Sequence, residues 1–138
     1  MGEVRLLDPC LREIGRVHDL VLRSYKTNVV VANVEVDVIA YYSTPSGYER
    51  TIVLELKETD FPRLVYQLFK RFDIGNYVYG AIALSPYHIL QSNEWFRAFI
   101  FLRSYGIGLI TCPKNDPQIL LKAKYRKNPI VKEVIEYE

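Results

Sequence analysis

The stretch "IVLELKETDFPRLVYQLFKRF", residues 52–72, decides the fold because it joins a strand directly to a helix. Its first part alternates apolar and charged side chains, as β-strands do. Asp60 followed by Pro62 is typical of a helix start, and apolar residues then recur at helical spacing. This order indicates an α/β protein. The unusual feature is the placement of Glu55 and Lys57 inside an otherwise apolar strand.

The flanking sequence predicts further elements. In chain order these are a helix at 9–24, one strand or two joined by a bend near Asn33 at 28–42, a turn at 43–49, strands at 76–84 and 106–112 separated by a helix at 92–105, and one or two helices in the tail, the last opened by Asn128 and Pro129. We therefore expect one domain, residues 1–138, with a central mixed β-sheet flanked by helices and a C-terminal helical extension at 113–138.

The amino-acid composition limits the classes of protein to which the chain can belong. The chain has 138 residues, 49% hydrophobic and 25% charged, with a net charge of +2. No apolar run is long enough to span a bilayer and the N-terminus lacks a signal-peptide pattern, so we expect a cytoplasmic protein without membrane contact. The many Tyr, Ile, Val, Lys, Arg and Glu residues favour a hyperthermophilic source. Cys10 and Cys112 are then either two reduced thiols or a disulfide.

The hairpin turn predicts which charged residues face one another. If the strands pair symmetrically about Ser46, residues whose numbers sum to 92 lie opposite. Asp37 then faces Glu55, and Glu35 faces Lys57. Directly opposed side chains on one face have Cβ atoms about 4.5–5.5 Å apart.

Two carboxylates so close repel each other unless a cation lies between them. Magnesium favours oxygen ligands, so Asp37, Glu55, water and the carbonyl of Leu56 are the predicted ligands. Lys57, on the same face, would orient an attacking water or stabilise negative charge. The alternative is a solvated hairpin face on which these residues form ordinary salt bridges.

The helix after Asp60 carries a polar flank. If its apolar stripe faces the sheet, the opposite flank presents a basic set beside the carboxylates: Arg63, Gln67, Lys70 and Arg71. Such a flank suits a phosphate backbone, although a solvated helix face has the same composition. A second basic cluster at 122–127 is a further candidate contact.

"VEVDVIA", then "ELK" after seventeen residues, then a helix with Gln67, resembles the PD-(D/E)XK nuclease superfamily, which includes restriction enzymes and archaeal Holliday-junction resolvases. Val36 stands where the motif has proline. The resemblance implies a restriction-endonuclease-like αβββαβ core, with Asp37 and Glu55 as metal ligands, Lys57 as the catalytic lysine, and Gln67 as the glutamine of the following helix. It also implies a homodimer, and Glu13 as an additional metal ligand from the first helix.

These features predict a DNA endonuclease that uses magnesium or manganese. Water oriented by Lys57 would attack phosphorus in line, and the resemblance implies products with 5′-phosphate and 3′-hydroxyl ends. Two alternatives stay open: a non-catalytic nucleic-acid-binding module on the same fold, and a structural or interaction protein whose charged pairs are salt bridges.

Overall fold

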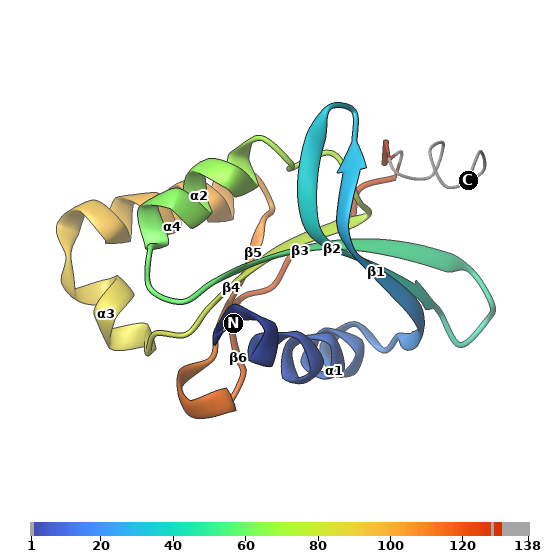
Figure 1. Ribbon diagram of the computed structural model, residues 1–138, viewed down its shortest axis with the longest axis horizontal. Coiled ribbons are helices and arrows are strands. Elements are labelled where there is room, and N and C mark those ends of the chain that lie inside the picture. The colour runs from blue at the N-terminus through green and yellow to red at the C-terminus, as the bar shows by residue number, and fades with distance from the viewer. Residues whose placement is uncertain (1, 128, 131–138) are drawn as a thin grey trace.

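One mixed β-sheet, with strands in chain order from β1 to β6, organises the protein in this computed structural model (Figure 1). The structure describes residues 2–127 and 129–130. Their elements are η1 (Gly2–Leu6), α1 (Leu7–His18), β1 (Val21–Val31), β2 (Val34–Ser43), β3 (Glu49–Lys57), α2 (Phe61–Phe69), β4 (Tyr77–Ile82), α3 (Pro86–Gln91), α4 (Asn93–Ser104), β5 (Gly108–Thr111), η2 (Pro113–Asn115) and β6 (Gln118–Leu121). The predicted single-domain α/β fold class is confirmed, and the order α1, β1, β2, β3, α2, β4 is the expected αβββαβ core.

The central strands run in two directions. β1, β2 and β3 are successively antiparallel, β3, β4 and β5 are parallel, and β6 is antiparallel to β5. Helix α1 lies on one side of the sheet, and α2 and α4 lie on the other (Figure 1). Because β3 and β4 are covered on both faces, their residues are almost all buried, as parallel strands require.

Each face of the sheet has its own core. The core beneath α1 includes Leu11, Ile14, Val38, Leu54 and Ile110. The core beneath α2 and α4 includes Ile39, Val53, Leu64, Leu68 and Leu102. Consecutive residues of β3 enter opposite cores because strand side chains alternate. The side chain of Glu55 therefore lies on the α2 face, two residues beyond Val53.

The first helix is shorter than predicted. It ends at His18, where Asp19 adopts a left-handed conformation with φ of 54°, and β1 begins at Val21. The prediction of helix through residue 24 was wrong because Val21 continues the helical spacing of apolar residues. β1 is an edge strand whose residues are mostly exposed, so apolar alternation does not mark it.

Both hairpins agree with expectation. Ala32 and Asn33 have positive φ values of 50° and 65°, as the two central residues of a type I′ turn require. The bend predicted near Asn33 is this turn. The β2–β3 ladder pairs Val38 with Leu54, so its residue numbers sum to 92 and the predicted register is confirmed.

The C-terminal region differs from the predicted helical extension. Residues 113–115 form a short 3-10 turn, and β6 pairs antiparallel with β5. The pairing covers an edge of β5 that would otherwise expose its backbone groups. The helix predicted from Asn128 onward lies outside the described residues, apart from positions 129 and 130.

Two further expectations concern the thiols and the membrane. Cys10 and Cys112 are buried free cysteines in the core beneath α1. In the described part of the chain, no helix is long and apolar enough to cross a bilayer.

Candidate active site

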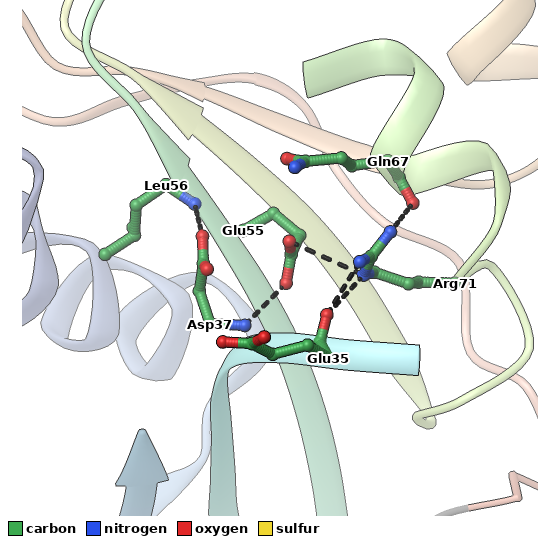
Figure 2. Close-up of polar contacts among 6 residues, drawn as sticks. All are labelled: Glu35, Asp37, Glu55, Leu56, Gln67 and Arg71. Atoms are coloured by element: carbon green, nitrogen blue, oxygen red, sulfur yellow. Dashed lines mark hydrogen bonds and ion pairs between the residues drawn. The ribbon is translucent and has the colours of Figure 1, made fainter. Parts of the chain in front are cut away.

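Asp37 and Glu55 meet where β2 and β3 separate. The last ladder pair is Val38 with Leu54, and beyond it β2 continues alongside β1. At the separation, the Asp37 N–H donates to Glu55 Oε2 at 2.8 Å, and the Leu56 N–H donates to Asp37 Oδ2 at 2.9 Å (Figure 2). The two carboxylates thus accept from backbone amides of the diverging strands. These two hydrogen bonds hold the carboxylates of Asp37 and Glu55 beside each other.

A bend in the β1–β2 hairpin accompanies this separation. Asn28 has φ of 55°, and its neighbours Thr27 and Val29 pair with Val38 and Val36. Asn28 therefore lies across from Asp37. Asparagine tolerates a left-handed conformation better than most residues. Asn28 was not among the predicted site residues, although an asparagine within a valine-rich strand is a signal for such a bend.

Arg71 enters the site from just beyond the end of α2. Its Nη2 and Nε donate to the carbonyl oxygen of Glu35 at 2.6 and 3.1 Å, and its Nη1 donates to the carbonyl of Gln67 at 2.8 Å. Nε also lies 3.5 Å from Glu55 Oε1 (Figure 2). Arg71 is only 9% exposed, so the structure does not place it on the solvated flank where we expected it.

The surroundings of the Glu55 side chain disfavour its ionised form. It is 1% exposed, and burial together with the charge of Asp37 raises its pKa to about 7. The amide of Asp37 and the positive charges of Arg71 and Lys57 act in the opposite direction but do not outweigh burial. A cation between the two carboxylates would relieve this repulsion and favour the ionised form of Glu55.

Lys57 follows Glu55 by two residues and is partly buried on the same face of β3. It lies close enough for its charge to lower the pKa of Glu55. The predicted pairing of Lys57 with Glu35 was wrong. Glu35 pairs with Val30 of β1 and is exposed, because the part of β2 on the N-terminal side of Val38 is not paired with β3.

Gln67 carries an oxygen without a hydrogen-bond partner. Its Oε1 is the one buried side-chain polar atom, among the described residues, that accepts nothing. In Figure 2 its amide extends from α2 on the side where Glu55 and Leu56 lie. Buried polar groups are nearly always hydrogen-bonded, and leaving one unsatisfied costs about 1–3 kcal/mol. Gln67 is therefore suited to accept a hydrogen bond from a ligand or water in the site.

The other predicted residues lie in different settings. Arg63 is exposed on α2, and Lys70 is exposed directly after the last residue of that helix, where its Nζ lies 4.4 Å from the centre of the Tyr66 ring. Leu56 contributes its amide to Asp37, and its side chain is buried. Glu13 forms an ion pair of 2.7 Å with Arg16 on α1, the helix that covers the face of the sheet opposite α2.

The residues present fit a hard divalent cation with few protein ligands. Within residues 2–127 and 129–130, no group of three or more His, Cys, Asp or Glu side chains could hold a metal. Magnesium often takes only one or two carboxylates and completes its shell with water and phosphate. Asp37 and Glu55 provide that number, and each oxygen keeps acceptor capacity beyond its amide bond.

Comparison with known proteins bears on the fold. No protein-family model and no curated protein matches the chain. The solved structure of a protein of unknown function from Silicibacter pomeroyi is similar to it, with a TM-score of 0.55 and 16% sequence identity. The match covers 94% of this chain and 79% of that chain. At this identity the similarity shows a shared fold.

Proposed function

We propose that the protein is a magnesium-dependent DNA endonuclease. The observation that carries this proposal is the junction of β2 and β3, where Asp37 and Glu55 are held together by the amides of Asp37 and Leu56. A carboxylate pair with one fully buried member, Glu55, is costly in a purely structural role. It becomes favourable when its task is to bind a cation beside a phosphodiester.

Each side chain has a defined part in this reaction. Asp37 and Glu55 would hold magnesium, which supplies Lewis-acid stabilisation for negative charge on the phosphoryl oxygens. Lys57 would donate to the attacking water or to the charged phosphate. Gln67 Oε1 would accept a hydrogen bond from that water, since it has no other partner among the described residues.

Arg71 acts as a positioning residue. It binds the carbonyls of Glu35 and Gln67 and lies beside Glu55, so it connects β2 to the end of α2 across the carboxylate. Arg63 and Lys70 are the exposed members of the predicted basic flank and would contact the DNA backbone. Contacts of this kind hold DNA without reading its sequence.

The proposal includes a homodimer in the cytoplasm. A chain of this size provides one carboxylate pair in its described residues, and cutting both strands of a duplex generally requires two sites. Sedimentation of the chain with and without DNA measures the oligomeric state directly.

Cleavage assays test the proposal. We expect the wild-type chain to cut at least one substrate from a panel of branched, linear and single-stranded DNAs when magnesium is present. Glu55→Ala and Lys57→Ala should each reduce the cleavage rate at least 100-fold, because general acid–base and electrostatic contributions are of about that size or larger. Circular dichroism should show that both variants remain folded.

Glu94→Ala and Lys114→Ala are matched controls, because both residues are exposed and lie on α4 and η2, outside the site. Both should cut at the wild-type rate. Cleavage at the wild-type rate by Lys57→Ala or Glu55→Ala would reject the assigned roles.

A non-catalytic nucleic-acid-binding protein is the second candidate, and Arg71 favours it. Its guanidinium lies 3.5 Å from Glu55 Oε1, where it neutralises part of the charge that a metal would otherwise meet. In this case the cluster would be structural, and the chain would bind DNA without binding a divalent cation.

A further inference from the structure

A charged cleft lies at the end of β2 and β3 away from the carboxylates, beside the turn that connects the two strands. Its volume is about 930 Å³, within the range typical of ligand sites. We call it the hairpin cleft. Its lining includes the basic residues Arg23, Arg50 and Lys127 and the aromatic residues Tyr42, Tyr48 and Tyr125. Among the described residues, Glu49 is the one acidic side chain in this lining.

We propose that the hairpin cleft binds single-stranded nucleic acid. We propose nucleic acid in preference to other polyanions because of the proposed nuclease function, and in this respect the inference rests on that proposal. The cleft is separate from the carboxylate pair. It includes Tyr125 and Lys127, from the region 122–127 that the sequence indicated as a further candidate contact for a phosphate backbone.

Aromatic side chains at the cleft indicate unpaired bases. Tyr48 is 65% exposed and Tyr125 is 47% exposed. The guanidinium carbon of Arg50 lies 4.9 Å from the ring centre of Tyr125 and 5.8 Å from that of Tyr48. Exposed rings combined with arginine are the usual elements of single-strand binding, since every base has a face on which such a ring can stack.

The walls of the cleft are held in place by a buried amide. Asn76 Oδ1 accepts from the backbone N–H of Thr51 at 2.8 Å and from its hydroxyl at 3.1 Å. Asn76 Nδ2 donates to the carbonyl of Arg126 at 2.9 Å, and the Arg126 N–H donates to the carbonyl of Asn76 at 2.8 Å. These bonds attach the segment with Tyr125 and Lys127 to β3. The cleft is therefore pre-organised.

The hairpin cleft and the candidate active site lie at different places along β3. Arg50 and Glu55 are five residues apart, or about 17 Å at 3.3 Å per residue, and this odd spacing points their side chains to opposite faces of the sheet. Binding in the cleft therefore does not require the same strand to reach the carboxylates.

Fluorescence anisotropy with a labelled 20-nucleotide single strand and its duplex tests this inference. Calcium would replace magnesium to prevent cleavage. We expect tighter binding of the single strand, and Tyr125→Ala should weaken that binding about tenfold, the size typical of one lost base stack. Tyr125→Phe keeps the ring and should bind like the wild type.

The salt dependence distinguishes stacking from charge. Arg50→Gln should weaken binding and reduce the slope of log Kd against log salt by about 0.7, the value for one lost phosphate contact on a single strand. Tyr125→Ala should leave this slope unchanged. Controls are Arg12→Gln on α1 and Tyr87→Ala on α3, both exposed and outside the lining of the cleft.

The binding and cleavage results distinguish the inference about the hairpin cleft from the proposed nuclease function. Unchanged affinity in both cleft variants, or no single-strand binding by the wild type at low salt, overturns the inference. Cleavage of DNA with either result would leave the proposed nuclease function standing. Loss of binding in the cleft variants of a chain that never cuts would support the cleft and reject the nuclease.

Discussion

Glu55 is the buried carboxyl group of the candidate site, and its ionisation governs the proposed binding of a cation there. Burial and the charge of Asp37 raise its pKa to about 7, despite Arg71 and Lys57 nearby. The spacing of Asp37, Glu55 and Lys57 could be predicted from strand alternation and the turn. Arg71 was predicted as part of the basic flank, but its buried position beside Glu55 was not, because the helical phase alone does not show that this arginine turns inward after the last residue of α2.

The raised pKa of Glu55 predicts a specific pH dependence of stability. Because the folded state holds the proton more tightly than the unfolded state, the stabilising contribution is complete below pH 4.5 and is lost as the pH rises through about 7. A shift of this size corresponds to about 3 kcal/mol. Urea unfolding of the metal-free protein at pH 5 and pH 8 measures it.

Glu55→Gln provides the reference for that experiment, because glutamine does not titrate. Between pH 5 and pH 8, the wild type should lose about 3 kcal/mol relative to this variant. Magnesium should reduce the loss by binding the ionised carboxylates. Parallel pH profiles for the two proteins would show that Glu55 does not titrate in this range.

The β2–β3 hairpin and α2 are the elements that build the site. Their order and register were predictable because turn residues and apolar periodicity are local signals. β6 was predicted as helix because its pairing with β5 is a long-range contact that no local pattern records. The separation of β2 from β3 on the N-terminal side of Val38 also depends on tertiary packing, so the symmetric turn wrongly predicted the Glu35–Lys57 pairing.

Close packing of α2 on the sheet depends on Gly80. Gly80 is the ladder partner of Glu55, and a Cβ atom at this position would lie 2.5 Å from Leu68 Cδ1. Gly80→Ala should therefore destabilise the fold by about 1–3 kcal/mol, the usual cost of overpacking. It should also lower activity, because α2 carries Gln67 and leads into Arg71. Urea unfolding and cleavage assays measure the two effects.

A double-mutant cycle with Leu68→Ala identifies the cause. If the clash with Leu68 is responsible, the double variant should be more stable than the sum of the two single changes predicts. Additive losses would show that Gly80 matters for another reason, such as its backbone conformation.

On the scale of the whole molecule, two charged regions lie along strands β2 and β3. The carboxylate pair lies where β2 and β3 separate, and the hairpin cleft lies at their turn. Arg63 on α2 and Lys70 just after it are exposed and add positive charge to the outer side of that helix. Such local clustering of basic side chains explains why a net charge of only +2 is compatible with the proposed nucleic-acid binding.

Calorimetric titration with manganese tests the central claim most directly, because cation binding requires Asp37 and Glu55 to act together. The wild type should bind manganese at pH 8 and bind it more weakly at pH 6, since a proton on Glu55 competes with the metal. Asp37→Asn and Glu55→Gln should each abolish binding while the proteins stay folded. Glu13→Gln should bind like the wild type. No binding by the wild type at pH 8, or unchanged binding by Asp37→Asn, would contradict a metal site at this junction.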